Sequence, residues 1–277
     1  MKKNKKKIKN FASNLSVKSI DLKKKVFQGE ILLTENFDEM ENLNRTINNF
    51  FIEFFGFTIE SFVNDFSLKV NENKLIKFQN LIKESKLVRN KFKKFIKSLG
   101  FNIDDTYCDM ITLRFSPSNN EISKGLLKPV QAHRDSWASN FQHQINWWIP
   151  LHDVSHKNGI YFIPNYFSKP VENDSDQWSF ESYKNLNKSF STPISLNKFE
   201  KKDYLSKKIN YGQALIFSGT HIHGSKIGLQ RRINIETRTL CSNDKNLYSI
   251  PKNVDNKSRK TRFNWFRSLS NSKVYND

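Results

Sequence analysis

The sequence predicts an α+β protein in which a helical segment supports an all-β core. Over residues 37–100, apolar residues such as Leu43, Ile47 and Phe51 recur at helical spacing. From residue 106 onward, apolar and polar residues alternate, and turn residues separate the runs, which is typical of strands. Helices followed by many short strands favour a helical buttress against a β-core, built either as a jelly roll or as a sandwich.

The first third of the chain divides into a tail and a helical part. Residues 1–25 are polar and rich in lysine, which predicts a basic, flexible N-terminal segment. Residues 26–277 are expected to form one domain, which begins with a short strand at 26–34. Residues 26–105 are mainly helical support, and Gly100 is expected to end the last helix.

Residues 106–241 carry the expected β-core. An insertion at 168–206 is polar and lacks periodicity, which predicts a lid or a mobile loop. Residues 242–277 form a tail in which 258–271 is predicted to be an amphipathic helix. The expected core strands are Tyr107–Phe115, His143–Leu151, Gly159–Ile163, Ile209–Ser218 and Ile233–Leu240.

The chain is strongly basic, with a formal net charge of +19. Such a charge is typical of proteins that bind nucleic acid or other anions. Here the lysines are spread along the chain, together with many Asn, Ile and Phe residues, so we favour a compositional bias for most of the charge. Nucleic acid is therefore a possible partner but not the favoured one.

Cysteine content and hydropathy indicate the cellular setting. Cys108 and Cys241 form no CxxC motif, and two thiols do not make a disulfide framework in 277 residues. We expect both to be small buried residues in a reducing cytoplasm. No apolar run reaches the roughly 18 residues of a membrane span, and no apolar stretch follows the basic N-terminus as in a secretory signal.

A His-x-Asp tripeptide begins the site. In an extended segment, His133 and Asp135 point to the same face, so an imidazole nitrogen and a carboxylate oxygen can approach one point. The pair would supply two ligands of a facial triad, which holds Fe(II) on one side and leaves the other side open. The tripeptide alone is weak evidence for a metal site, because most such pairs lie on solvated surfaces.

The third ligand must come from a distant histidine. Both His221 and His223 follow an apolar strand at 214–217, and the spacing leaves the choice open. Arg232 lies nine residues after His223 (232 − 223 = 9), on the next expected strand. Its guanidinium can form a bidentate pair with the distal carboxylate of a dicarboxylic cosubstrate such as 2-oxoglutarate.

Residues 100–265 resemble the phytanoyl-CoA dioxygenase-like family of Fe(II)/2-oxoglutarate-dependent oxygenases. The resemblance rests on four stretches: Ala132–Trp137 (AHRDSW), Gln144–Pro150 (QINWWIP), Phe217–Ser225 (FSGTHIHGS) and Arg232–Thr239 (RINIETRT).

The resemblance implies a fold, a cofactor set and a reaction. The core would be a double-stranded β-helix of the jelly-roll or cupin-like kind. Fe(II) would be held by His133, Asp135 and His223, with 2-oxoglutarate and O2 as cosubstrates. The family's distal histidine commonly precedes Gly-Ser and stands six residues after a strand Phe, which His223 does and His221 does not. The reaction would be hydroxylation of an unactivated C–H bond with release of succinate and CO2. Asp135 favours hydroxylation, since related halogenases carry a small residue there.

This chain departs from the family pattern near Arg232. The loop after His223 is about two residues shorter than is usual, which makes Arg231 a rival for the cosubstrate. Asn234 stands where some related enzymes have Ser or Thr. Arg114 is a candidate second cation for the cosubstrate, with Lys128 behind it, and a structural salt bridge is an equal alternative for Arg114.

The substrate is expected to be a small molecule, with an anionic or polar metabolite favoured. Candidate substrate contacts are Trp137, Trp148 and Arg238, although large aromatic residues more often belong to a core. Trp147 and Trp148 should face opposite sides of their strand. The alternative functions are a nucleic-acid demethylase of the same superfamily, a non-catalytic anion-binding jelly roll, and a metal-dependent isomerase or hydrolase. The sequence makes no prediction of the oligomeric state.

Overall fold

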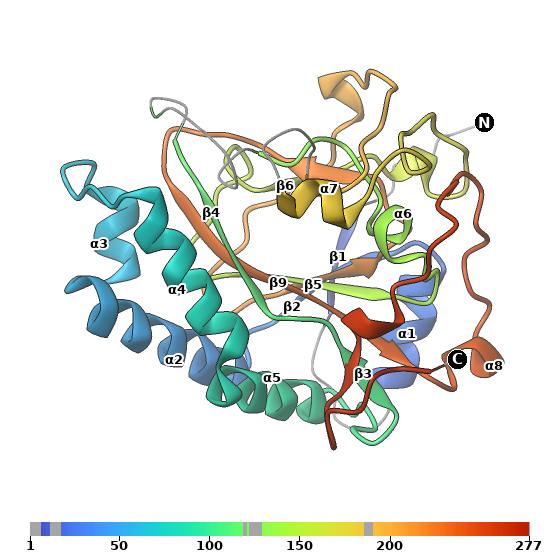
Figure 1. Cartoon of the computed structure of the whole chain (residues 1–277), viewed down its shortest axis with the longest axis horizontal. Helices are drawn as coiled ribbons and strands as arrows, with labels where there is room; N and C mark the ends of the chain where they lie inside the picture. Colours follow the sequence, from blue (N-terminus) through green and yellow to red (C-terminus); the bar gives the residue numbers. More distant parts are fainter. Residues whose placement is uncertain (1–6, 12–17, 119–120, 122–128, 186–190, 277) are drawn as a thin grey trace.

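A large, mostly antiparallel sheet, a small antiparallel sheet and a layer of helices make up the computed structural model, which describes residues 7–11, 18–118, 121, 129–185 and 191–276 (Figure 1). The helices are α1 (Lys18–Phe27), α2 (Asp38–Phe55), α3 (Ile59–Asn64), α4 (Glu72–Glu84), α5 (Lys86–Ser98), α6 (Asp135–Ser139), α7 (Phe180–Asn185) and α8 (Asp244–Leu247). The strands are β1 (Ile8–Phe11), β2 (Ile31–Thr34), β3 (Thr106–Cys108), β4 (Thr112–Ser116), β5 (Ile145–Pro150), β6 (Ile160–Phe162), β7 (Leu215–Ser218), β8 (His223–Ser225), β9 (Arg232–Cys241) and β10 (Arg267–Ser268).

The larger sheet is centred on β9. Within the described residues its strand order is β1-β2-β7-β5-β9-β3-β10, and β4 also pairs with β9. All of these pairings are antiparallel except that between β1 and β2. β9 therefore contacts β5 along one edge and both β3 and β4 along the other, so its side chains occupy the middle of the sheet.

The smaller sheet consists of β6 and β8, extended by single bridges at either side. One bridge pairs His133 with His223 in β8, and another pairs Phe162 in β6 with Leu205. Apolar side chains of both sheets, such as Trp148 and Phe217 from the larger and Phe162 from the smaller, pack between them. Two facing sheets with helices outside one of them confirm the predicted α+β class with a jelly-roll core.

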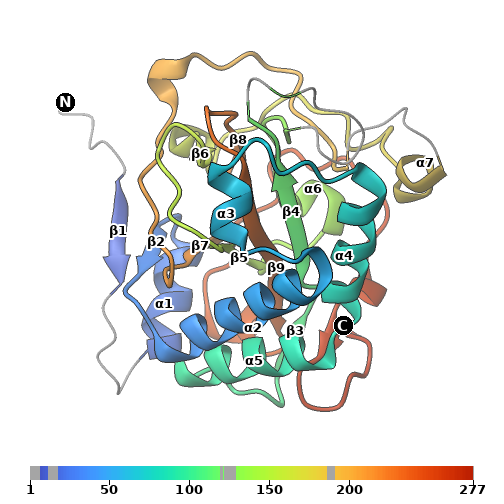
Figure 2. The same ribbon diagram turned by 90° about the vertical axis from the view of Figure 1, so that its left-hand side faces the viewer.

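The helical layer covers the outer face of the larger sheet. Figure 2 shows α2, α4 and α5 in front of that sheet. Aromatic residues fill the space between the layers: Phe92 and Phe95 pack edge-on against Trp147 of β5, with ring centroids 6.1 and 5.7 Å away. Trp147 thus faces the helices and Trp148 faces the smaller sheet, as strand alternation predicts.

Helix ends follow local sequence rules. The side chains of Asn71 and Ser85 accept hydrogen bonds from the first-turn backbone amides of α4 and α5. Gly56 after α2 and Gly100 after α5 adopt positive φ angles of 85° and 80°. A residue without a Cβ atom is favoured in that left-handed conformation, so both helices stop where the sequence places glycine.

The N-terminal prediction needs correction. Residues 1–25 were expected to be flexible, yet β1 and most of α1 lie within this segment. Val26 and Phe27, expected to open a strand, are the last residues of α1, and the strand begins at Ile31. α1 is ordered because Leu22 and Val26 are buried in the main core and the Lys23 ammonium pairs with Asp244 at 2.7 Å.

Two other predicted elements also differ. The strand expected at 107–115 is split into β3 and β4, because the chain leaves the ladder around Asp109. Residues 258–271 form no amphipathic helix but a short 3₁₀ turn at Phe263–Trp265 followed by β10. In this tail, Phe266 and Tyr275 are buried against Phe141, and backbone groups bond to the core instead of to a helix of their own.

Cys108 and Cys241 are both buried free thiols, as predicted. None of the helices in the described ranges is long and apolar enough to cross a membrane.

The Lys23–Asp244 pair predicts a large effect on stability. Lys23→Met should lower the free energy of unfolding by about 3 kcal/mol, because it leaves a buried carboxylate without its cation. Urea denaturation measures the change, and Lys24→Met, one position along and exposed, is the matched control. Equal unfolding midpoints for the two variants would show that the pair does not anchor α1.

Candidate metal centre

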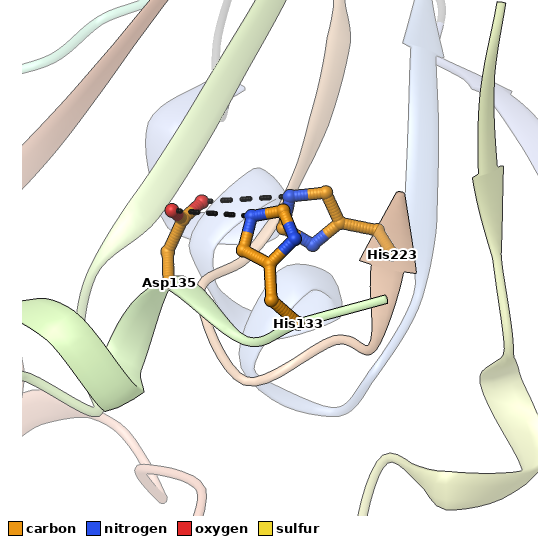
Figure 3. Close-up of side chains that lie close together, drawn as sticks. All are labelled: His133, Asp135 and His223. Carbon is orange, nitrogen blue, oxygen red and sulfur yellow. Dashed lines mark ion pairs between the residues drawn. The ribbon is translucent and has the colours of Figure 1, made fainter. Parts of the chain in front are cut away.

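His133, Asp135 and His223 come together where the smaller sheet meets α6. The backbones of His133 and His223 form reciprocal hydrogen bonds of 2.9 and 3.0 Å, which set the two rings side by side with centroids 4.2 Å apart. Asp135 is the first residue of α6 and turns its carboxylate toward both rings (Figure 3). Oδ1 lies 3.8 Å from Nε2 of His133, and Oδ2 lies 3.6 Å from Nε2 of His223.

Both imidazoles are held by their other nitrogen. Nδ1 of His133 lies 2.7 Å from the carbonyl of Gln131, and Nδ1 of His223 lies 3.0 Å from the carbonyl of His221. A carbonyl can only accept, so each Nδ1 carries a proton, and Nε2 of each ring is the nitrogen that faces Asp135 and is left to bind a metal. Metal-binding histidines are commonly oriented in this way.

The carboxylate of Asp135 is oriented from outside the triad. Arg238 donates to Oδ1 at 3.0 Å, and the Asn146 amide donates to Oδ2. Burial opposes ionisation of Asp135, but the positive charge of Arg238 outweighs burial and holds the pKa of this carboxyl well below the usual range. Burial, and next the neighbouring His223, lower the pKa of His133 to about 3, so this ring is neutral near pH 7.

The donor set fits a divalent transition metal. One ligand atom from each of His133, Asp135 and His223 lies within 4.8 Å of the others, and all three residues are buried. Two imidazole nitrogens with one carboxylate on a single side match a facial triad and leave the cavity side open for other ligands. A Mg²⁺ or Ca²⁺ site would need mostly oxygen donors, which this centre lacks.

A cavity opens beside the triad, between the two sheets. Its charged lining residues besides the triad are Asp109, Arg114, Glu236 and Arg238. Trp148 and Phe217 contribute apolar walls, and Thr192 reaches it from the 168–206 insertion. Of the residues predicted to meet substrate, Trp148 and Arg238 therefore line the cavity. Trp137 does not: it packs in a separate cluster with its Nε1 donating to Asp255 at 2.8 Å.

Arg232 lies on the inward face of β9, behind the cavity wall formed by Trp148 and Ser225. It is fully buried, and all of its N–H groups have acceptors: backbone carbonyls, Asn234, and the hydroxyls of Ser116 and Ser225 at 2.7 and 3.2 Å. Within the described residues, no carboxylate lies within ion-pair distance of it. Burial lowers its pKa to about 10, so it remains a cation near pH 7.

Arg231, the alternative candidate for binding the cosubstrate, points away from the cavity and toward α3. Arg231 pairs with Glu121 at 2.7 Å and donates to backbone carbonyls of Phe62, Asp65 and Leu68 in and after α3. Its guanidinium also stacks on Phe62. Arg231 thus fastens α3 to the sheet, and it does not line the cavity.

His221 lies outside the triad. Its Nδ1 and Nε2 lie 3.2 Å from the carbonyls of Ser218 and Gly29, and its ring packs against Phe167. Its backbone carbonyl accepts from Nδ1 of His223 and so links it to the triad. Lys128, named with Arg114 as a second cation, lies outside the described residues.

Sequence reasoning missed a support beneath the triad. Arg134, between the two ligands, is buried and donates to Asp255 at 3.0 Å and to backbone carbonyls of Tyr166, Lys169 and Thr220. Asp255 also accepts from Trp137. The two partners are 121 positions apart, and no local pattern indicates such a pairing. The C-terminal tail therefore stabilises the loop that carries His133 and Asp135.

Comparisons with known proteins found structural likeness only. No protein-family model matches the sequence, and no curated protein matches it. The fold is similar to crystal structures of EvdO2 from Micromonospora carbonacea var. aurantiaca. Complexed with 2-oxoglutarate, EvdO2 aligns at 10% identity over 60% of this chain and 64% of that one, with a TM-score of 0.41. A second crystal structure of EvdO2 aligns at 9% identity over 79% of this chain and 90% of that one, with a TM-score of 0.48.

The apo structure of ThoJ, a non-heme monooxygenase, is also similar, at 10% identity over 79% of this chain and 76% of that one, with a TM-score of 0.40. This chain thus spans less than two thirds of the 2-oxoglutarate complex of EvdO2 but more of the other two chains. At such identities and TM-scores, the assignment of function rests on the residues of the site itself.

The ion pairs that hold the Asp135 carboxylate should affect the affinity of the site for a metal ion. Asp109 pairs with Arg238 at 2.9 Å, and Arg238 in turn holds Asp135. Asp109→Asn should weaken Co(II) binding by about tenfold, because Arg238 loses its second anchor and orients Asp135 less firmly. Absorption titration with Co(II) measures the affinity. Asp153→Asn, in the exposed pair with Lys208, is the control, and identical affinities in both variants would refute the role of Asp109.

Proposed function

We propose that this protein is a mononuclear non-haem Fe(II) oxygenase that uses 2-oxoglutarate and O2 to hydroxylate an unactivated C–H bond of a small molecule. The observation that carries the proposal is the buried triad, in which two imidazole nitrogens and one carboxylate converge. Nδ1 of each histidine is held by a backbone carbonyl, and the carboxylate accepts from Arg238. The second observation is the buried Arg232 on the next strand along the chain, which has no carboxylate ion-pair partner among the described residues.

Bound Fe(II) would supply the centre at which 2-oxoglutarate and O2 react to give succinate, CO2 and an oxidant able to attack a C–H bond. Its protein ligands would be His133, Asp135 and His223. Arg238 and Asn146 would keep the Asp135 carboxylate ionised and oriented. Asp135 occupies the position that a small residue takes in related halogenases, which supports hydroxylation.

Arg232 would receive the distal carboxylate of 2-oxoglutarate. A hydroxyl both donates and accepts, so Ser116 and Ser225, which now accept from Arg232, can turn and donate to an incoming carboxylate. Asn234 accepts from Nε of Arg232 at 3.1 Å and would keep the guanidinium in place. This role explains how Asn can stand where related enzymes have Ser or Thr: it orients the arginine.

The apolar walls would exclude water from the reacting centre. Trp148, Ile160 and Phe217 line the cavity and belong to the core cluster between the sheets. Exclusion of water strengthens electrostatic contacts and limits side reactions of an oxidant.

Two variants separate metal binding from cosubstrate binding. Asp135→Ala should weaken Co(II) binding by about 10- to 100-fold and abolish succinate formation from 2-oxoglutarate with Fe(II), because it removes a ligand. Arg232→Leu should bind Co(II) normally yet lose about tenfold or more in affinity for 2-oxoglutarate, read as the spectral change of bound Co(II) without O2. Arg45→Leu, on the exposed face of α2, is the control.

Either of two results would contradict the proposal. One is stoichiometric Fe(II) binding by the wild-type protein with no 2-oxoglutarate consumption, which would favour a non-catalytic anion-binding jelly roll. The other is succinate formation by Asp135→Ala at the wild-type rate.

A further inference from the structure

One cation at the cavity keeps open hydrogen-bond donors. Arg114 on β4 donates only through Nε, to Oε2 of Glu236 at 3.1 Å, and in the described part of the chain its Nη1 and Nη2 groups have no acceptor. Arg238 is already occupied by Asp109 and Asp135, and Arg232 is saturated. The side chain of Arg114 is 23% exposed and lines the cavity.

The strand register places Arg114 between the two other arginines. On the inward face of the sheet, Thr112 lies opposite Glu236, Arg114 opposite Asn234, and Ser116 opposite Arg232. Arg232, next to Ser116, is proposed to hold the cosubstrate, and Arg238, two residues beyond Glu236, contacts Asp135. Arg114 therefore faces the cavity between the cosubstrate anchor and the metal centre.

Thr192 adds a second unsatisfied group. It is 5% exposed, its Oγ1 has no hydrogen-bond partner among the described residues, and it lines the same cavity from the 168–206 insertion. A buried hydroxyl without a partner is costly, and a ligand in the cavity would satisfy it.

We propose that Arg114 binds a carboxylate of the substrate, so that the substrate is a small carboxylic acid. This inference rests on the proposed function and adds its substrate class. Glu236 fixes Nε of Arg114, and the remaining two nitrogens form a fork that matches the two oxygens of a carboxylate. Thr192 then contacts a polar group of the same molecule. Arg114, expected from the sequence to be a second cation for the cosubstrate, thus becomes the substrate anchor.

Charge explains why the ligand is neither a phosphate nor 2-oxoglutarate itself. Among the described residues that line the cavity, three carboxylates (Asp109, Asp135 and Glu236) face two guanidiniums (Arg114 and Arg238). A dianion at Arg114 would lie beside Glu236 and be repelled, whereas a carboxylate adds a single charge. Arg232 forms no ion pair with a carboxylate among the described residues, and the hydroxyls of Ser116 and Ser225 contact its guanidinium, which suits a carboxylate of the cosubstrate.

Ligand-observed NMR on the full chain loaded with Zn(II) and 2-oxoglutarate tests the proposal without turnover. The probes are a panel of small aliphatic and aromatic carboxylates, each compared with its primary amide and, for the aromatic members, with phenyl phosphate. We expect at least one carboxylate to bind at about 10 mM while its amide does not, since the amide lacks the charge for Arg114. Binding of no carboxylate, equal binding of the amides, or preferred binding of phenyl phosphate would overturn it.

Variants that are expected to change carboxylate affinity in opposite directions exclude a folding defect as the cause of weaker binding. Arg114→Met should weaken binding of the best carboxylate by roughly tenfold or more, and Arg114→Lys should have an intermediate effect because it retains charge without the fork. Glu236→Gln should strengthen that binding, because Arg114 is then uncompensated. Arg45→Met, which removes one positive charge from an exposed helix face, should leave it unchanged.

The affinity for 2-oxoglutarate separates this inference from the proposed function. Arg114→Met should keep wild-type affinity for 2-oxoglutarate, while Arg232→Leu loses it. If Arg114→Met loses 2-oxoglutarate instead, Arg114 serves the cosubstrate and the inference fails while the oxygenase assignment stands. If the wild-type protein binds no 2-oxoglutarate, the oxygenase assignment fails, and the carboxylate panel with Zn(II) alone still reports on Arg114.

Discussion

Along β9, side chains that face inward alternate with side chains that pack under the helices. Ile233 and Ile235 belong to the core shared with the helical layer, while Arg232, Asn234, Glu236 and Arg238 face the smaller sheet. One face of β9 therefore contributes to the apolar core, and its other face carries the polar groups between the two sheets. Since β9 is flanked by β5 and β4, the inward groups of three strands meet there.

The inward groups are joined in a chain of hydrogen bonds. Arg232 donates to Asn234, Asn234 donates to Glu236, and Glu236 accepts from Arg114. A second set links Asp109, Arg238 and Asp135. An unpaired ion at such depth costs several kcal/mol, so the partners fix one another in place. Arg114 is the member of this network whose remaining donors still face the cavity.

The triad depends on contacts far along the chain as well. The reciprocal backbone bonds between His133 and His223 set the distance between the rings, and Arg134 with Asp255 ties the loop of His133 to the C-terminal tail. Residues 242–277 lack the predicted helix, yet Asp255 within them supports the centre. A truncation of the tail would thus act on the metal site rather than on a peripheral element.

From apolar periodicity and glycine stops, which depend on neighbours along the chain, the sequence by itself determined the helical region at 37–100 and the strand content of the second part. Its resemblance to a known family added the jelly-roll class. It also singled out His133, Asp135 and His223, which the fold brings together. Only the tertiary structure decided that residues 18–27 form a docked helix, that Arg231 and Trp137 face away from the cavity, and that Asp109, Asn146 and Asp255 support the triad. Such pairings join residues far apart in sequence, and local propensity carries no information about which distant carboxylate a buried cation will meet.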